Sequence, residues 1–309
     1  MALSGSYDYS ANAGEIVTLS LRTLGVLAED EAATASQMND GLKRLNMMLK
    51  AWRARGISLP LYQELTVYLQ AGKQSYLLGA TGDKATATPY KTELAADAAS
   101  GAGSVTVDSA SDFTNGDNVG IVQDDNTILW TTGTKSGSVI TLGTTLTAAA
   151  STDNHVYFYT TIAQRPLTVK GARLKINDGN ETPVRVITRQ EYFDYNNKSS
   201  QGKINAVYYD PQITNGVLYT YLTADSVSDT LNLTVQRQLS DLDATTDDFD
   251  FPIEWMEPIY MNLCLRMLTK YGIDSETGTQ IRADAGEFLR TAEDFDQEDQ
   301  IQFVPTYEH

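Results

Sequence analysis

The sequence has few of the residues that build disulfides, histidine-based catalytic sites or metal centres. Its 309 residues include one cysteine, Cys264, and two histidines, His155 and His309. A single cysteine cannot form an intrachain disulfide, so packing must hold the fold together, and we expect assembly in a reducing compartment. With two histidines, the chain has almost no candidates for the base of a Ser-His-Asp or Cys-His catalytic site. Two histidines and one cysteine also supply too few of the usual zinc ligands for a structural zinc site. We therefore predict no catalytic residue, no metal site and no enzymatic activity.

Long apolar runs and positive charge are scarce as well. No stretch approaches the roughly 18 consecutive apolar residues of a membrane span, and the first residues lack the basic and apolar segments of a secretion signal. The chain has 23 Lys and Arg residues against 40 Asp and Glu, a formal net charge of −17. Because nucleic acid is bound mainly through Lys and Arg, this balance argues against a protein that grips DNA or RNA.

The loops that could bind a nucleotide or calcium do not contain the complete sequence motifs for such sites. Residues 101–103 lack the third glycine of a dinucleotide site, and residues 79–84 lack the spacing of a phosphate-binding loop. Residues 112–117 and 124–126 contain aspartates without the full calcium-loop pattern, and hairpin turns favour the same residue types. We therefore expect no cofactor.

The negative charge is concentrated at one end of the chain. Residues 241–309 contain 17 acidic and 4 basic side chains, so −13 of the total charge of −17 lies in this segment. The C-terminal region is thus chemically distinct from the rest of the molecule.

Both ends of the chain show helical periodicity, and capping pairs precede the two N-terminal helices. The capping pairs are Asn12 with Glu15 and Thr34 with Gln37. The predicted helices are 13–25, 34–55 and 252–271, with a further helix from about Glu276.

The polar side of the second predicted helix carries the densest basic cluster of the chain. Its residues are Lys43, Arg44, Lys50, Arg53 and Arg55. One interpretation is a solvated helix face. The alternative is a contact with another subunit or an acidic partner, for which Lys43, Arg44, Arg53 and Arg55 are the candidates.

The middle of the chain has the patterns of β structure, in two parts. Strand patterns with a period of two begin after Pro60 and return between residues 162 and 240. Residues 81–161 are instead rich in Ala, Gly, Ser, Thr and Asp, with short apolar runs separated by turn residues at regular spacing. This composition predicts a small antiparallel β barrel or sandwich, inserted between elements of another sheet.

Together these patterns predict an α+β fold, with an α-helical bundle from the N- and C-terminal helices, a small antiparallel sheet and an inserted all-β module. The predicted domains are 1–80 for the helical hairpin and first strands, 81–161 for the β module, 162–250 for the rest of the sheet, and 251–309 for the C-terminal helices and an extended tail. The apolar stretch 301–307 lies beyond the last predicted helix, so we expect it to dock elsewhere.

Two segments carry a resemblance to a known family. Residues 16–26 and 42–57 form an apolar helical hairpin ending in Arg55-Gly56-Ile57, and residues 251–272 run from Phe-Pro-Ile-Glu-Trp to Tyr271-Gly272. This arrangement resembles the head-to-tail adaptor proteins of short-tailed bacteriophages, also called packaged DNA stabilisation or tubular tail A-type proteins. The first segment is similar to the opening helical hairpin of that family and the second to its C-terminal helix.

The resemblance implies a structural virion protein, assembled in the host cytoplasm and located at the head-to-tail interface. A twelve-membered homo-oligomeric ring below the portal protein ring would extend the DNA channel, help retain the packaged genome and join the tail tube or nozzle. Duplex DNA would pass through without specific binding, and no membrane would be involved. The C-terminal segment would dock on the portal, a role that falls on Ile301, Phe303, Val304 and Tyr307. The acidic residues that would line the channel stay unassigned.

Two other classes of function are open. One is a virion-associated cell-wall hydrolase, and the other is a glycan-binding decoration protein that acts through the β module. For glycan binding, the candidates for stacking on sugar rings are Trp130, Tyr157 and Tyr159. These residues lie in predicted strands, where alternate side chains face the core, so core packing is the competing interpretation.

Overall fold

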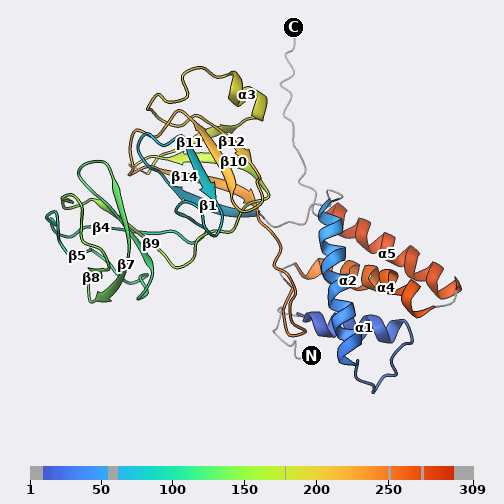
Figure 1. The fold of residues 1–309 in the computed structure, drawn as a ribbon. Helices are drawn as coiled ribbons and strands as arrows, with labels where there is room; N and C mark the ends of the chain where they lie inside the picture. The colour runs from blue at the N-terminus through green and yellow to red at the C-terminus, as the bar shows by residue number, and fades with distance from the viewer. Residues whose placement is uncertain (1–9, 55–61, 178, 250–251, 273–274, 296–309) are drawn as a thin grey trace, which may run out of the picture. The chain divides into compact units, whose positions relative to one another are not determined.

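In the computed structural model, the chain forms two compact units. One combines Met1–Leu61 with Leu239–His309 and is called the helical unit, and the other, Tyr62–Gln238, is called the β unit (Figure 1). The structure describes residues 10–54, 62–177, 179–249, 252–272 and 275–295. The helical unit thus brings together both ends of the sequence, whereas the β unit is one continuous stretch.

The described part of the helical unit consists of α-helices and one short 3-10 helix. They are α1 (Ala13–Thr23), α2 (Ala35–Ala54), η1 (Ile253–Trp255), α4 (Met256–Tyr271) and α5 (Ser275–Phe295). The predicted helices are confirmed, except that the third begins with the 3-10 turn η1. The first capping pair is confirmed too, because the backbone N–H of Glu15 donates to Asn12 Oδ1 at 2.9 Å and that of Asn12 donates to Glu15 Oε2 at 3.0 Å.

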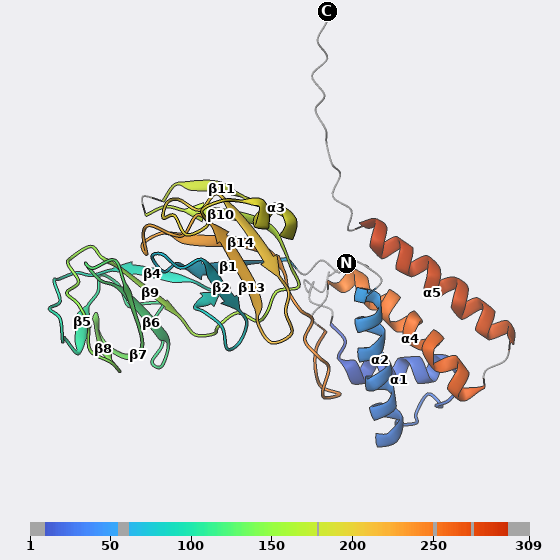
Figure 2. The same cartoon turned by 45° about the horizontal axis from the view of Figure 1, so that its top comes forward.

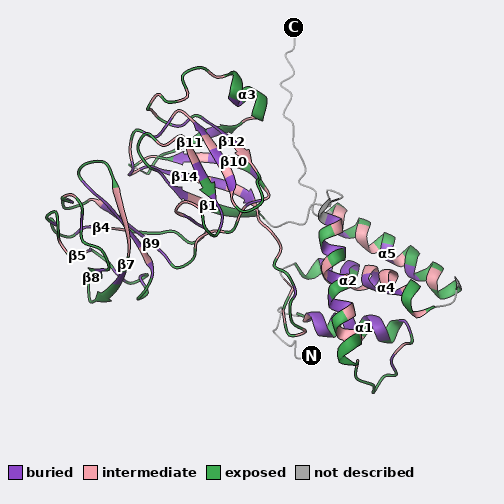
Figure 3. Cartoon of the chain, viewed as in Figure 1, coloured by how far each residue is buried: buried purple, intermediate pink, exposed green. Residues whose placement is uncertain are grey.

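Helices from the two ends of the chain bury a common apolar core. Trp52 of α2 and Trp255 of η1 are both buried, with ring centroids 6.2 Å apart. Figure 3 shows buried stretches along α1, α2 and α4. Leu21 of α1 and Ile259 and Leu263 of α4 are fully buried in the same core. Each such side chain stabilises the fold by about 1.5–3 kcal/mol when it leaves water. Each end of the chain therefore supplies apolar surface that the other end covers.

An eight-stranded sheet is the larger part of the β unit (Figure 2). Its strands, in their order across the sheet, are β2 (Ser75–Leu78), β13 (Gly216–Tyr221), β12 (Ala206–Asp210), β11 (Glu181–Val186), β10 (Thr168–Lys175), β14 (Thr230–Gln236), β1 (Tyr62–Tyr68) and β3 (Ala85–Thr86). Neighbouring strands are antiparallel except for β11 and β12, which are parallel. The sequence pattern of residues 189–193 predicts a short helix, and the structure confirms it as α3 (Arg189–Asp194). Tyr192 of α3 packs against Tyr208 and Tyr219.

The other sheet of the β unit has six antiparallel strands and its own apolar core. In order across the sheet, the strands are β4 (Tyr90–Glu93), β9 (His155–Tyr159), β6 (Asn118–Val122), β7 (Ile128–Ser136), β8 (Val139–Leu142) and β5 (Ser104–Thr106). The outermost strands β4 and β5 meet at a bridge between Leu94 and Val107, so the sheet nearly closes into a small barrel. The sequence pattern predicts short strands at residues 104–107, 118–122, 127–130, 138–142 and 155–159, and all of these strands are confirmed.

The predicted fold class is wrong. The protein is mostly β, with sheets of eight and six strands, and it is not a helical bundle with a small antiparallel sheet. The error arises because a strand pattern shows where a strand lies but not which strand it pairs with. β1 and β2 follow each other around the turn at Gly72, yet β1 lies between β14 and β3 while β2 pairs with β13. These long-range pairings assemble scattered short strands into one large mixed sheet.

Candidate functional site

The basic cluster predicted on α2 is partly used inside the helical unit. Arg44 Nε lies 2.9 Å from Asp40 Oδ2, and Arg44 Nη1 donates to the carbonyl oxygen of Arg266 at 3.0 Å. Lys270 of α4 places its Nζ 2.7 Å from the same Asp40 oxygen. Hydrogen bonds from Lys270 and Arg44 lower the pKa of the Asp40 carboxyl below its usual value. Arg44 therefore joins α2 to α4 within one subunit.

The other residues of the cluster differ in their surroundings. Lys50 pairs with Asp241 at 3.0 Å, and both side chains are largely exposed. Lys43 is exposed on the outer side of α2. The side chain of Arg53 and all of Arg55 lie outside the described residues. Of the predicted contact residues, Lys43 is thus the one that the structure places on the surface.

A second set of polar contacts fastens the segment that follows Leu239 to the N-terminal helices. The Asn46 amide donates to the carbonyl of Leu242 at 2.8 Å and accepts from its N–H at 3.1 Å. The N–H groups of Ala13 and Gly14 donate to the carbonyls of Asp247 and Thr245 at 2.9 and 2.8 Å. These contacts could not be predicted from the sequence, because a lone Asn within an amphipathic helix gives no signal of a distant partner.

Acidic side chains of the helical unit have several roles. Asp247 Oδ2 accepts from the N–H groups of Asp243 and Ala244 at 2.8 Å each, so it closes a turn. Glu287 and Asp294 of α5 are exposed. The predicted portal-docking residues Ile301, Phe303, Val304 and Tyr307 lie outside the described residues.

The stacking candidates of the β module belong to a buried aromatic cluster. Tyr68 of β1 lies with its ring centroid 4.9 Å from those of Trp130 and Tyr157 and 5.9 Å from that of Tyr159. Burial raises the pKa values of all three tyrosines above their usual range. The Tyr157 hydroxyl also donates to the carbonyl of Ser228 at 3.0 Å. The cluster therefore joins the two sheets of the β unit, which is the core-packing interpretation.

One glycine makes this aromatic cluster possible. Gly120 of β6 lies opposite Trp130 of β7, and a Cβ atom at Gly120 would come within 2.6 Å of the indole ring. Only glycine leaves room for the indole ring at this position.

The aspartates in the turns of the β module accept hydrogen bonds from the backbone. Asp117 Oδ2 accepts from the N–H of Thr114 at 2.8 Å, and Asp124 accepts from the N–H of Ser151 at 3.0 Å and from Asn154 Nδ2 at 2.7 Å. Within the described ranges, no three His, Cys, Asp or Glu side chains gather in a way that could hold a metal ion. These contacts agree with the turn interpretation of both segments.

Comparisons with known proteins add no assignment: no model of a protein family matches the sequence, and no curated protein matches it significantly. Among the helices that the structure describes, none has the length and apolar character needed to span a membrane.

Proposed function

We propose that the protein is a structural virion component, a head-to-tail adaptor that forms a ring below the portal of a short-tailed bacteriophage. In this role it extends the DNA channel, helps retain the packaged genome and joins the tail tube or nozzle. A ring of twelve copies is expected from the resemblance. The proposal involves no catalysis and no cofactor.

One observation carries this proposal. The two segments that resemble the adaptor family are far apart in the sequence, but their described residues fold into one helical core. Trp52 from the first segment packs on Trp255 from the second, and the Cys264 Sγ lies 3.8 Å from the carbonyl oxygen of Ser20. A chance resemblance of two unrelated segments gives no reason for them to share a core.

The regional acidity supports the same role. Duplex DNA must slide through an adaptor channel, and carboxylates on its wall repel phosphate over a range of about 8 Å at physiological salt. The helical unit contains the acidic C-terminal region, including the exposed Glu287 and Asp294 of α5. The alternative is that these side chains only keep the surface soluble. A ring structure in which all Asp and Glu side chains of residues 241–299 point away from the channel would contradict the channel role.

The test of the proposal is the mass of the full chain in solution. Light scattering is recorded for the protein alone and mixed with its cognate portal ring, at matched salt. We expect a large complex of fixed stoichiometry in the mixture, and we expect it to be lost when the chain ends at Phe295, before the predicted docking residues. A full-length protein whose mass does not change with the portal ring contradicts the proposal.

Charge reversal separates the contact surface from general effects of charge. Lys43→Glu places an acidic side chain on the exposed side of α2, and we expect weaker assembly, especially at low salt. Lys170→Glu makes the same change at an exposed position of β10 in the β unit. Equal assembly of the two variants would remove Lys43 from the proposed interface.

A further inference from the structure

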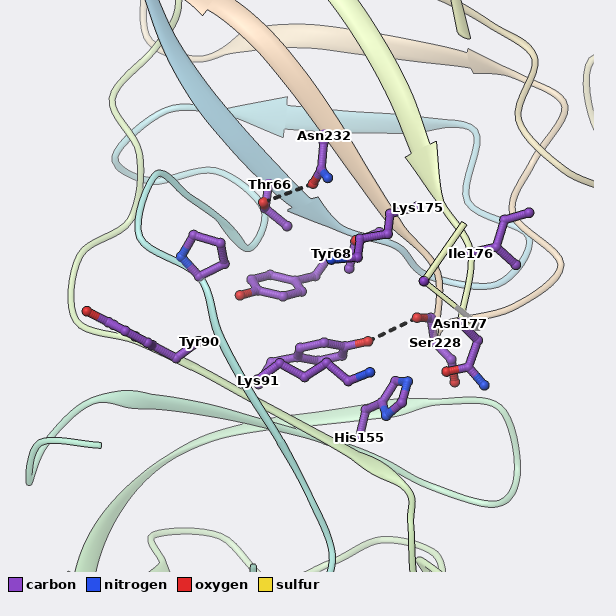
Figure 4. Close-up of a pocket in the computed structure, with 14 residues that line it drawn as sticks. Thr66, Tyr68, Tyr90, Lys91, His155, Lys175, Ile176, Asn177, Ser228 and Asn232 are labelled. Atoms are coloured by element: carbon purple, nitrogen blue, oxygen red, sulfur yellow. Dashed lines mark hydrogen bonds between the residues drawn. The ribbon is translucent and has the colours of Figure 1, made fainter. Parts of the chain in front are cut away.

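The β unit contains a cleft of about 190 Å³ between its two sheets, lined by β1, β10 and β14 on one side and by β4 and β9 on the other. Figure 4 shows Tyr68 and His155 in this lining. Two of its polar groups make contacts inside the protein: the Tyr157 hydroxyl donates to the carbonyl of Ser228, and His155 Nδ1 lies 3.4 Å from Glu93 Oε1. The cleft is therefore part of the joint between the two sheets.

The outer face of α2 presents a row of exposed side chains. They are Asn39, Lys43, Met47 and Lys50. Met47 is 58% exposed and lies between the two lysines. Among the residues that the structure describes, Lys43 has no ion-pair partner, whereas Lys50 pairs with Asp241 at 3.0 Å. This face therefore offers apolar surface and a free positive charge.

The outer face of α5 carries a groove of about 510 Å³. Its charged residues fall in two rows along the helix, Glu287 with Asp294 and Arg282 with Arg290. None of these four side chains has an ion-pair partner in the described part of the chain. Ala283 and Gly286 are the smallest residues of the lining, and a Cβ atom at Gly286 would meet no neighbour within 4 Å. The backbone of α5 is thus open to a close approach by another helix.

The exposed row of α2 matches one row of this groove in spacing and in charge. The matching row of α5 consists of Ala283, Glu287, Thr291 and Asp294. Both rows have spacings of four, four and three residues, and in both the two charged residues are about 10.5 Å apart along the helix. When the rows lie side by side in the same direction, Lys43 meets Glu287 and Lys50 meets Asp294. The two faces are therefore complementary in charge.

Within one copy, these two faces point to different sides of the helical unit. Helix α4 is joined to α2 by the ion pair of Lys270 with Asp40, and to α5 by the hydrogen bond from Asn262 to the carbonyl of Ala285. Figure 2 shows α4 between α2 and α5. A contact between α2 of one copy and α5 of the next is therefore head-to-tail, the kind of contact that closes rings.

The direction of the two helices agrees with this contact. Figures 1 and 2 show the C-terminal ends of α2 and α5 at the same end of the helical unit. In a ring of about twelve copies, neighbours differ by a rotation of only about 30°. Helix α2 of one copy and α5 of the next therefore run in the same general direction, as the matched rows require.

We propose that α2 of one copy packs on α5 of a second copy in the ring. The facing pairs are Asn39 with Ala283, Lys43 with Glu287, Met47 with Thr291 and Lys50 with Asp294. Lys50 then lies between Asp241 of its own copy and Asp294 of the second copy. The inference rests on the proposed ring, and it names the neighbouring surface that Lys43 contacts.

The test is cross-linking between copies that carry one new cysteine each. Full-length Met47→Cys and Thr291→Cys are mixed, with and without the portal ring, and treated with a short bifunctional maleimide. Because Cys264 is buried, it contributes little background. We expect linked pairs in this mixture, but not in Met47→Cys alone or in Met47→Cys mixed with Lys170→Cys, whose new thiol lies at an exposed position of the β unit.

The outcomes separate this contact from the adaptor role. Absence of linked pairs, both with the portal ring and without it, overturns the contact. Linked pairs in Met47→Cys alone overturn it too, because they show two α2 faces packed on each other. A portal complex of fixed mass without linked pairs removes the contact and leaves the adaptor role standing. Linked pairs without portal binding do the reverse.

Charge exchange tests the pairing itself. Glu287→Lys should weaken the association of copies about fivefold in sedimentation measurements, because it brings two positive charges together. The variant that combines it with Lys43→Glu should recover the original association, since the pair is restored with its signs exchanged. Glu29→Lys, at an exposed position between α1 and α2, is the matched control and should neither weaken association nor rescue Lys43→Glu. A combined variant that stays weak would contradict the pairing of Lys43 with Glu287.

Discussion

The shared core of the helical unit predicts that a mutation near the N-terminus loosens a helix near the C-terminus. Leu21 of α1 is fully buried beside residues of α4, and Leu21→Ala should cost about 3 kcal/mol, since it removes buried methyl groups and leaves a cavity. Leu19, on the same helix, is 47% exposed, and Leu19→Ala should change the stability by less than about 0.5 kcal/mol. The two variants make the same chemical change at a buried and an exposed position.

The sole cysteine provides the assay. Cys264 of α4 is buried and free, and burial raises the pKa of its thiol to about 11. The folded protein should therefore react very slowly with a thiol reagent, and labelling should report the opening of α4. If opening and closing are fast relative to labelling, a loss of about 3 kcal/mol raises the labelling rate about 100-fold. We expect this acceleration for Leu21→Ala and almost none for Leu19→Ala.

Equal labelling rates in the two variants would refute the reasoning. So would an unchanged rate in Leu21→Ala, because it would mean that α4 stays closed when the core contributed by α1 is damaged. Urea unfolding followed by circular dichroism gives an independent value. With a slope of about 1.5 kcal/mol per molar urea, the helical transition of Leu21→Ala should shift downward by about 2 M.

Three further predictions concern single contacts. Asp40→Asn should lower the free energy of unfolding by about 1 kcal/mol at pH 7, because hydrogen bonds from Lys270 and Arg44 lower the pKa of the Asp40 carboxyl and its charged form therefore stabilises the folded protein. In urea titrations at several pH values, this difference should begin to shrink as the pH approaches the usual value of 3.8 and should vanish only below the lowered pKa of the folded state. Gly120→Ala should destabilise the β unit by about 1–3 kcal/mol and change the fluorescence of Trp130, because its Cβ would overlap the indole. Tyr157→Phe should cost about 1 kcal/mol in thermal or urea unfolding, because the hydrogen bond to Ser228 is lost.

Each of these changes has a matched control. Asp30→Asn alters an exposed acid between α1 and α2 and should leave the pH dependence as it is. Gly103→Ala adds a methyl group whose nearest neighbour is 3.9 Å away, so it should be tolerated. Tyr159→Phe removes a buried hydroxyl that has no partner in the described structure and should not reduce stability. A variant that behaves like its control would show that the assigned contact has no energetic role.

The local elements of the helical unit follow from neighbouring residues. The Asn12 and Glu15 capping box, the spacing of apolar residues along α2 and the Gly272 that ends α4 are all short-range features, and Gly272 adopts the left-handed conformation that glycine favours at a helix end. The strands β6 and β9 have the bounds predicted from their sequence patterns. The helices and their caps can be predicted because their hydrogen bonds lie within a few residues, and the strands can be located because their residue preferences and turn residues are local.

The pairing of strands and the contacts of polar side chains do not follow in this way. The sequence does not show that β1 pairs with β14, or that β2 pairs with β13 rather than with β1. Nor does it show that Arg44 forms an ion pair with Asp40 of its own helix rather than with a partner protein. It also does not show that Tyr68 and His155 meet in one cleft, because they lie on strands of different sheets.

Local sequence patterns were enough to place the helices and most short strands, to exclude a disulfide within the chain and to locate the negative charge after residue 240. The predominance of β structure, the core shared by the two chain ends and the side chains that line the cleft became visible only in the folded protein. These two groups of features differ in the range of the interactions behind them. Caps, turns and periodicity act over a few residues, whereas sheet pairing, core burial and the partners of buried polar groups join residues that are far apart in the sequence.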